Sequence, residues 1–257
     1  MPEEAVASPE DGETHDEAAL MGGRARLRQP LRGYRAGLDA ALLAAVVEAG
    51  PGERVLEAGC GAGGALVQAA LRNPGAAFVG VERDGAALAL ARSNLALNDL
   101  EARARALPGD VGAGFRALGL ERFDAAFANP PFFDDPAALR APSPERRGAW
   151  MADDGLAAWC AFLLAAVRDG GRVTMVHRAD RLADLLAGLG AKAGSLAVRP
   201  VHPFPDAPAK RVLVRAVRGG RGPLRLLPAL VLHAQDASGF TPEADALLRG
   251  QAALSWT

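Results

Sequence analysis

The chain has 257 residues, of which 50% are hydrophobic and only 5% aromatic, and its formal net charge is −1. This length suits one α/β domain or two small ones, and the aliphatic composition favours helices packed on a sheet over an all-β sandwich. The two cysteines, Cys60 and Cys160, are too few for a disulfide framework or a four-ligand zinc site.

No membrane span or secretion signal is expected from the sequence. The longest strongly apolar stretch, residues 156–167, is shorter than the roughly 20 residues that cross a bilayer. The first residues are acidic and contain neither a basic region nor an apolar region of a signal peptide. We therefore expect a cytoplasmic protein.

The acidic side chains that precede Arg24 give the chain an uneven charge distribution. They are Glu3, Glu4, Glu10, Asp11, Glu13, Asp16 and Glu17. Residues 1–23 also lack apolar periodicity, which predicts a disordered acidic tail. Residues 24–257 are then expected to form a single, net basic domain.

Strands and helices are expected to alternate along this domain. Asp39 is a candidate cap for a first helix that ends near Gly50. Strands are predicted at 54–58, 77–82, 102–107, 123–128, 172–177, 211–217 and 226–232. A helix is predicted to run from Asp84, its expected cap, to Asn98. Other helices are predicted to end near 71, to run from Asp153 or Asp154 to 169, to end near 190, and to begin near 242. The alternation predicts a Rossmann-like, doubly wound, mainly parallel sheet of seven strands.

A glycine-rich turn joins the predicted strand 54–58 to the following helix. Gly59, Gly61 and Gly64 fit the G-x-G-x-x-G pattern of dinucleotide-binding proteins. Glu57, Gly59, Gly61 and Gly63 fit the E-x-G-x-G-x-G pattern of methyltransferases. Glycine lets backbone N–H groups approach a ligand closely, so the turn predicts a cofactor site of one of these two kinds.

Glu82 ends the next predicted strand, 77–82. A carboxylate at this place can accept hydrogen bonds from both ribose hydroxyls of a nucleotide cofactor. Because either cofactor contains a ribose, Glu82 supports the site but does not choose between the two patterns.

Asn129, Pro130, Pro131 and Phe132 follow the predicted strand 123–128. The prolines lack N–H donors and cannot continue a central strand, so they predict a stiff exit at the carboxyl edge of the sheet. The Asn129 side-chain oxygen and the Pro130 carbonyl are then two acceptors that can hold an exocyclic amine. Phe132 offers a ring on which a flipped base can stack.

These two motifs, in this order, resemble those of the class I S-adenosylmethionine-dependent amino-methyltransferases with an (N/D)-P-P-(Y/F) motif. The resemblance implies the class I methyltransferase fold and S-adenosylmethionine as cofactor. It implies that Asn129, Pro130, Pro131 and Phe132 bind the target amine. It implies a cofactor-binding set of Glu57, Gly59, Gly61, Gly63, Glu82, Asp110 and Asn129, in which Glu82 holds the ribose and Asp110 the adenine amino group.

Residues 29–40, followed by Leu42 and Leu43, are similar to the segment that precedes the glycine loop in the bacterial tRNA1(Val) adenine-N6 methyltransferase family. This resemblance implies a nucleic-acid partner, tRNA, and methylation of adenine N6. Arginines lie on both sides of the predicted core, at Arg24, Arg26, Arg28, Arg32 and Arg35, and at Arg199, Lys210, Arg211, Arg215, Arg218, Arg221 and Arg225. We expect them to form a basic rim for RNA at the catalytic edge.

Several alternatives remain open at this stage. Asn-Pro-Pro-Phe also occurs in guanine-N2 rRNA methyltransferases, and release-factor glutamine methyltransferases use Asn-Pro-Pro followed by an aromatic residue. Outside this class, a nicotinamide-dependent oxidoreductase would use Gly59, Gly61 and Gly64. No metal is expected, because the four histidines show no metal-ligand spacing.

Overall fold

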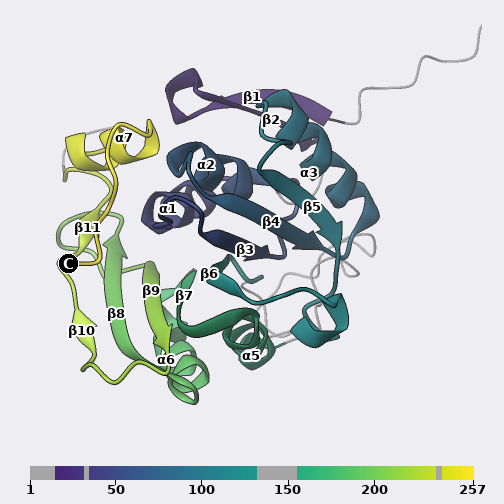
Figure 1. Ribbon diagram of the computed structural model, residues 1–257. Coiled ribbons are helices and arrows are strands. Elements are labelled where there is room, and N and C mark those ends of the chain that lie inside the picture. Colours follow the sequence, from purple (N-terminus) through teal and green to yellow (C-terminus); the bar gives the residue numbers. More distant parts are fainter. Residues whose placement is uncertain (1–14, 32–34, 132–154, 236–238) are drawn as a thin grey trace, which may run out of the picture.

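The computed structural model describes residues 15–31, 35–131, 155–235 and 239–257 (Figure 1). Within them, a main sheet has the strand order β10-β8-β9-β7-β6-β3-β4-β5, and β11 also pairs with β8. In chain order these strands are β3 (Arg54–Ala58), β4 (Ala77–Glu82), β5 (Ala104–Pro108), β6 (Phe123–Ala128), β7 (Val167–Arg178), β8 (Ala193–His202), β9 (Arg211–Arg218), β10 (Arg225–Leu226) and β11 (Leu230–Val231). Strand β9 is antiparallel to β7 and β8, and the other pairs in the sheet are parallel.

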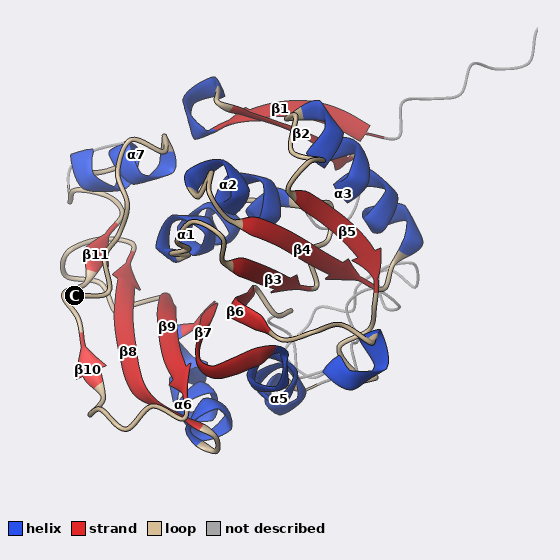
Figure 2. Ribbon diagram, in the orientation of Figure 1, coloured by secondary structure: helices blue, strands red, loops and turns tan. Residues whose placement is uncertain are grey.

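Helices cover both faces of this sheet (Figure 2). One face is covered by α1 (Leu38–Val46), α2 (Gly64–Arg72) and α3 (Gly85–Leu97), and the other by α5 (Leu156–Ala166) and α6 (Leu182–Gly190). A last helix, α7 (Pro242–Leu248), contacts α1. The three-layer arrangement confirms the predicted doubly wound α/β fold.

The buried strands explain this layering. Successive side chains of a strand point to opposite faces, so Val55 belongs to the core beneath α1–α3 and Leu56 to the core beneath α5 and α6. Both residues are 0% exposed, as expected for a parallel strand with helices on each side. The strand order reverses at β3, which has β4 on one side and β6 on the other. Ligands of open α/β sheets bind at the carboxyl edge of such a reversal.

The seventh long strand differs from the predicted one. Residues 193–202 form β8, which the sequence analysis did not identify, whereas the predicted strand 226–232 is split into the two-residue strands β10 and β11. Pro228 separates these short strands, and a proline cannot donate to a sheet ladder. With β8 in place, the seven long strands have the order that a doubly wound sheet with one antiparallel strand requires.

The predicted disordered tail is wrong for residues 15–23, while residues 1–14 lie outside the described part of the chain. A separate two-stranded antiparallel sheet is formed by β1 (His15–Leu20) and β2 (Ala25–Pro30). Its acidic residues find basic partners: Glu17 pairs with Arg26 at 2.6 Å and Asp16 with Arg35 at 2.8 Å. Leu27 of β2 is 0% exposed and anchors this hairpin to the core.

One predicted helix cap is wrong and one is confirmed. Helix α1 begins after Gly37 without a side-chain cap, and Asp39, the expected cap, instead pairs with Arg211 at 3.0 Å. Asp84 caps α3 as predicted, because its carboxylate accepts a hydrogen bond from the Ala87 N–H at 2.7 Å. The expected helix start at Asp153 or Asp154 lies outside the described residues.

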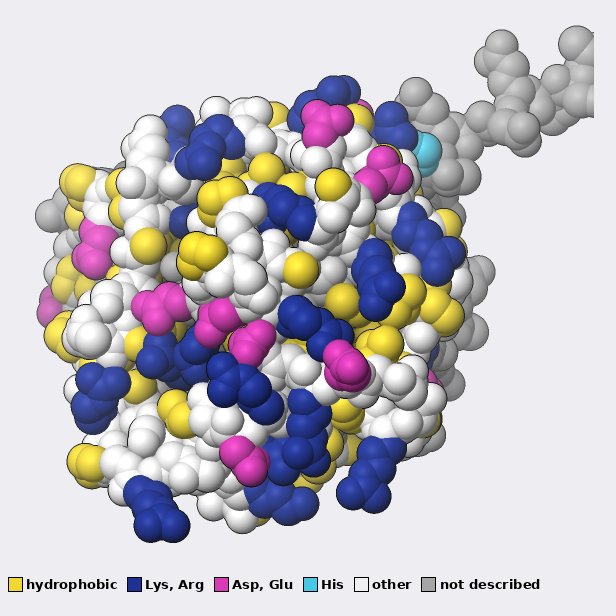
Figure 3. Space-filling model, viewed as in Figure 1, with side chains coloured by type: hydrophobic (Ala, Val, Ile, Leu, Met, Phe, Trp, Pro, Cys, Tyr) yellow, Lys and Arg dark blue, Asp and Glu magenta, His cyan; other side chains and the backbone are white. Residues whose placement is uncertain are grey.

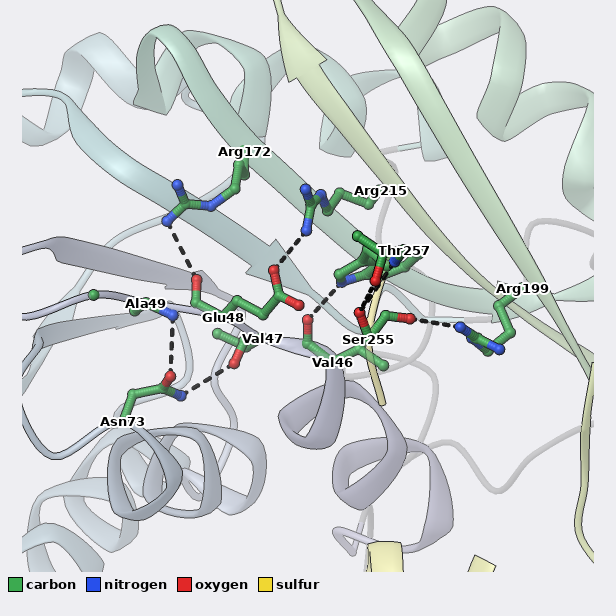
Figure 4. A network of polar contacts seen from close by, with 12 residues as sticks. Val46, Val47, Glu48, Ala49, Asn73, Arg172, Arg199, Arg215, Ser255 and Thr257 are labelled. Atoms are coloured by element: carbon green, nitrogen blue, oxygen red, sulfur yellow. Dashed lines mark hydrogen bonds and ion pairs between the residues drawn. The ribbon is translucent and has the colours of Figure 1, made fainter. Parts of the chain in front are cut away.

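The last residues of the chain bind to α1 and to β8, where Ser255 lies beside Arg199 (Figure 4). Trp256 is 2% exposed, and its indole Nε1 donates to the Val46 carbonyl of α1 at 2.8 Å. Arg199 of β8 donates to the Ser255 carbonyl at 2.5 Å and Arg225 to the Trp256 carbonyl at 2.8 Å. The C-terminal segment is therefore part of the folded core.

No helix in the described ranges combines the length and apolarity needed to cross a membrane. In the same part of the chain, no group of three or more His, Cys, Asp or Glu side chains is arranged to hold a metal ion.

Candidate active site

Sheet register places four strand ends side by side at the carboxyl edge. Ala58 of β3 pairs with Ala128 of β6, so Gly59 and Asn129 leave the sheet next to each other. On the other side, β3 pairs with β4 up to Val81, and Glu82 of β4 pairs with Pro108 of β5. The glycine loop, Glu82, Asp110 and Asn129, which are far apart in sequence, are thereby aligned along one edge.

The glycine loop follows the E-x-G-x-G-x-G spacing. Gly59, Gly61 and Gly63 have φ values of +64°, +54° and +84°, in the left-handed region that favours glycine. Gly64 has an ordinary backbone conformation, and a Cβ there would collide with Ala36. The loop therefore needs the first three glycines for its conformation and Gly64 for close packing with the segment ahead of α1.

Gly61 borders open space, whereas Gly59 does not. A Cβ built on Gly61 meets no atom within 4 Å, but one built on Gly59 would lie 2.5 Å from the Trp159 ring of α5. Trp159 is 7% exposed and packs on the loop as a core residue. The open side of the loop is thus at Gly61, whereas Gly59 packs against Trp159.

Glu82 is fixed by the loop that it faces. Its Oε2 accepts the Gly61 N–H and its Oε1 accepts the Asp84 N–H, both at 2.9 Å. A carboxylate offers about four acceptor positions, so each oxygen can take a further donor. Next along the edge, the exposed Asp110 carboxylate accepts a hydrogen bond from the Gly112 N–H at 2.9 Å. This contact forms an Asx turn, which fixes the orientation of the carboxylate.

Glu57 lies beneath the loop in the interior of the protein. It is 3% exposed, and its Oε2 is a buried oxygen without a hydrogen-bond partner. Burial raises the pKa of Glu57 well above its ordinary value, and the Glu82 carboxylate raises it further, whereas a hydrogen bond from the Leu66 backbone N–H lowers it. Such a carboxyl group favours a cationic or hydrogen-bond-donating neighbour.

Asn129 and Pro130 follow β6 as predicted. Pro130 is buried and Asn129 is half-buried, at the point where the chain leaves the sheet beside Gly59. Pro131 is the last described residue here. Phe132, the remaining residue of the predicted motif, lies outside the described residues.

Asn94 of α3 also supports the loop, although no sequence motif points to it. This side chain is 0% exposed, and its Nδ2 donates to the carbonyl of Ala62 in the loop at 2.8 Å and to that of Arg28 in β2 at 2.9 Å. Its Oδ1 accepts the Arg28 N–H at 2.7 Å. A polar residue on the otherwise apolar inner face of the predicted helix 84–98 is the signal that would have identified it.

The predicted basic rim is wrong for most of the late arginines. Arg199 and Arg225 bind C-terminal carbonyls, and Arg218 donates to the carbonyls of Leu164 and Val167. On the face seen in Figure 3, basic and acidic side chains are intermingled. These arginines stabilise the fold. Of the late group, Lys210 and Arg211 lie at the carboxyl edge, where antiparallel β9 begins.

A cavity of about 840 Å³ lies at the opposite, amino edge of the sheet. It is lined by Arg72, Arg172 and Arg215, among others. Each of these guanidinium groups donates to a carboxylate or a backbone carbonyl of the protein. Figure 4 shows Arg172 and Arg215 beside Glu48. The cavity is separate from the edge that carries the glycine loop.

Comparisons with known proteins agree with this arrangement. Residues 35–141 match the family described as methyltransferase small domain. A tRNA1(Val) (adenine(37)-N6)-methyltransferase of Porphyromonas gingivalis is 30% identical over 190 residues, which cover 70% of this chain and 72% of that protein. A release factor glutamine methyltransferase of Caulobacter vibrioides is 38% identical over 78 residues, 30% of this chain and only 26% of that protein.

Solved structures share the fold. The crystal structure of a predicted O-methyltransferase from Agrobacterium tumefaciens superposes with a TM-score of 0.70 and 29% identity, covering 84% of this chain and 98% of that one. An S-adenosylmethionine-dependent O-methyltransferase from Thermotoga maritima gives a TM-score of 0.52 at 19% identity, covering 74% and 68% of the two chains, and supports the fold alone.

Proposed function

This chain belongs to the methyltransferase small domain family of S-adenosylmethionine-dependent enzymes, and we propose that it methylates an exocyclic amino nitrogen, adenine N6 in tRNA. The family excludes the nicotinamide-dependent alternative. The proposed substrate is supported by the Porphyromonas relative, whose match covers 70% of this chain, and by the chemistry of Asn129 and Pro130 at the end of β6. The matched regions span 26% of the Caulobacter relative and 72% of the Porphyromonas relative.

The residues at the glycine loop fit S-adenosylmethionine. The open space at Gly61 admits a ligand against the backbone. The buried Glu57 Oε2, which has no partner in the protein, suits a cationic or donor group of the methionine part. Glu82 retains acceptor positions for two ribose hydroxyls, and Asp110 lies next to it for the adenine amino group.

In this proposal Gly59, Gly61 and Gly63 flank the methionine part. Asn129 contributes to cofactor binding as well as to catalysis. When bound, the cofactor supplies an electrophilic methyl group on a positively charged sulfur. The carboxyl edge at the reversal of strand order is where such a ligand is expected to bind.

The observation that carries the proposal is the pairing of Ala58 with Ala128, which sets Asn129 beside the glycine loop. An amino group attached to an aromatic ring is a poor nucleophile, because its lone pair is delocalised. The Asn129 side-chain oxygen and the Pro130 carbonyl can accept its two hydrogens and aim the lone pair at the methyl carbon. As the new N–C bond forms, the S–C bond breaks, and the product ammonium afterwards loses a proton to solvent. Positioning provides most of the rate, and no general base is required.

In the same proposal Pro131 stiffens the exit and Phe132 stacks on the target base. The methyltransferase domain is assigned to residues 24–257. Strand β1 precedes this domain and pairs with its first strand, β2.

The test is a labelled methyl-transfer assay on unmodified tRNA, rRNA and total protein, with the RNA digested to nucleosides for mass spectrometry. The expected product is N6-methyladenosine in tRNA. N2-methylguanosine in rRNA would retain the site chemistry but refute the substrate. A 2′-O-methyl nucleoside would refute transfer to nitrogen.

A second candidate is the side-chain amide of a release-factor glutamine, which the Caulobacter relative favours through its 78 matched residues. An amide nitrogen also has a delocalised lone pair and two hydrogens, so Asn129 and Pro130 would act on it in the same way. Transfer of the labelled methyl group to protein and not to RNA in the same assay would support this candidate over an RNA substrate.

A further inference from the structure

A cluster of three rings lies outside the site described above. The His233 ring stacks on Phe240 with centroids 4.9 Å apart and planes at 20°, and it also contacts Phe204 at 5.6 Å with planes at 39°. Both phenylalanines are unusually exposed for large apolar residues, at 42% for Phe204 and 43% for Phe240. Folding alone does not account for two rings so open to water.

These rings lie at the same edge of the sheet as the glycine loop. Strand β8 ends at His202 and β11 at Val231, and both strands run parallel to β6. Phe204 and His233 therefore follow strand ends at the carboxyl edge. Between β8 and β6 lie β9 and β7, so three strand spacings of about 4.8 Å separate them laterally by about 14 Å.

Backbone hydrogen bonds hold the rings in place. The His233 N–H donates to the Pro203 carbonyl at 2.9 Å, which joins the segments that carry His233 and Phe204. His233 forms an antiparallel bridge with Phe240, and its ring Nδ1 lies 3.0 Å from the Gly239 carbonyl oxygen. An aromatic surface fixed in this way binds without a large loss of side-chain entropy.

The charges around the cluster are mixed. The Lys210 N–H donates to the Val201 carbonyl at 3.0 Å, which places this exposed lysine near the end of β8, the strand that leads to Phe204. Asp206 and Glu243 are exposed acidic residues in the neighbouring segments. Because its charges are mixed, this patch as a whole attracts phosphate groups only weakly. The aromatic rings are therefore the part of the patch that would recognise a ligand.

We propose that Phe204, His233 and Phe240 form a stacking platform for an unpaired base of the RNA substrate, close in sequence to the methylated adenine. The inference rests on the proposed function and adds a second contact for the same RNA. Bases stack on aromatic side chains irrespective of sequence, and a single-stranded loop several nucleotides long can reach both the Asn129 exit and a platform at the same edge of the sheet. Lys210 contacts the adjoining phosphate.

Two variant pairs separate stacking from packing. Phe204→Leu and Phe240→Leu keep apolar volume but remove the ring, whereas Phe204→Tyr and Phe240→Tyr keep the ring. Each Leu variant is expected to weaken binding of a substrate RNA loop about tenfold, within the range for one base–aromatic stack, and each Tyr variant to restore it. The matched control is Leu226→Ala, because Leu226 is 70% exposed on β10, away from this edge.

The measurements are the dissociation constant for RNA, KM and kcat for methyl transfer, and the dissociation constant for S-adenosylhomocysteine. The expected result is a raised RNA dissociation constant and KM in the Leu variants, with unchanged kcat and S-adenosylhomocysteine affinity. Unchanged RNA binding in both Leu variants would overturn the platform even if the wild type methylates RNA. Methylation of protein but not RNA by the wild type would instead overturn the proposed function, and with it the platform as an RNA site.

Discussion

Asn129 is the residue on which the proposed chemistry depends most directly. Replacing it by alanine removes one of the two acceptors, so the amine is no longer aimed at the methyl group. We expect Asn129→Ala to lower kcat by about 10²-fold or more, the usual effect of losing reactant alignment. Affinity for S-adenosylhomocysteine, measured by calorimetry, should fall by much less than kcat, because Asn129 is only one of the proposed cofactor contacts. A variant with unchanged kcat would remove Asn129 from the mechanism.

Gly59 and Gly61 both have positive φ but face different surroundings, so the same substitution should have different effects. Gly59→Ala places a methyl group 2.5 Å from Trp159 and should reduce the free energy of unfolding by about 1–3 kcal/mol through overpacking and backbone strain. Gly61→Ala meets no atom and should mainly weaken cofactor binding, because its methyl group occupies the open side of the loop. Urea unfolding and S-adenosylhomocysteine titration of both variants provide the comparison. Equal loss of stability in the two would contradict it.

Glu57 makes stability depend on pH. Burial raises its pKa in the folded state above that in the unfolded chain, so the folded state binds its proton more tightly. Its effect on stability is therefore absent below the ordinary pKa near 4.5 and becomes unfavourable as pH rises towards the folded-state value. Glu57→Gln should be more stable than the wild type at pH 8, and the difference should shrink as the pH falls to 4.5. A difference that does not vary with pH would show that Glu57 does not titrate in this way.

At the scale of elements, α3 serves as a partner for the hairpin strand β2. Asn94 and Asn98, one helical turn apart, each exchange hydrogen bonds with a backbone N–H and C=O of β2, at Arg28 and Arg26 respectively. The i, i+4 spacing of the helix thus matches the i, i+2 spacing of the strand. Two amide side chains on the helix satisfy backbone groups that a neighbouring strand would otherwise pair.

This arrangement predicts unequal effects for the two asparagines. Asn94 is buried and also binds the glycine loop, so Asn94→Ala should lower the free energy of unfolding by about 2–4 kcal/mol. Asn98→Ala, at a more exposed site, should lower it by about 1 kcal/mol. Chemical denaturation measures both, and hydrogen exchange of the β2 amides reports on the hairpin. If Asn98→Ala were the more damaging, the helix would not support the hairpin as described.

How far the sequence predicts these elements depends on where their stabilising partners lie. The residues that are close in sequence indicate the strands 54–58, 77–82 and 123–128 and the Asp84 cap. The structure has these strands at the predicted bounds and has the cap. Strands β1 and β8 were not predictable in this way. β1 is stabilised by pairing with β2 and by ion pairs to Arg26 and Arg35, and β8 by its place between β9 and the short strands. The sequence pattern identifies Glu82 as a residue of the cofactor site. The hydrogen bonds that its carboxylate accepts from the Gly61 and Asp84 N–H groups are visible only in the folded structure.

At the scale of the whole molecule, several arginines of the late strands connect distant parts of the chain. Arg199, Arg225 and Arg218 donate to carbonyls, and Arg215 pairs with Glu48 at 2.7 Å while its guanidinium lies 5.6 Å from the centre of the Trp256 ring. Sequence clustering of basic residues suggested a surface for RNA, but strands β8 and β9 distribute them over both ends of the sheet. A guanidinium group has five donors and satisfies buried carbonyls well, which explains this use.

Trp256 is where this network joins the end of the chain to α1, so its loss should affect the whole fold and not the C-terminal segment alone. Trp256→Ala removes a ring that is 2% exposed and the bond to the Val46 carbonyl, and should lower the free energy of unfolding by about 3–5 kcal/mol. Trp256→Phe keeps most of the packing but not the bond, and should lose less. Unfolding followed by both far-UV circular dichroism and tryptophan fluorescence should show a single transition at lower denaturant concentration. A local loosening of residues 254–257, with an unchanged global transition, would show instead that the segment only covers a core that is complete without it.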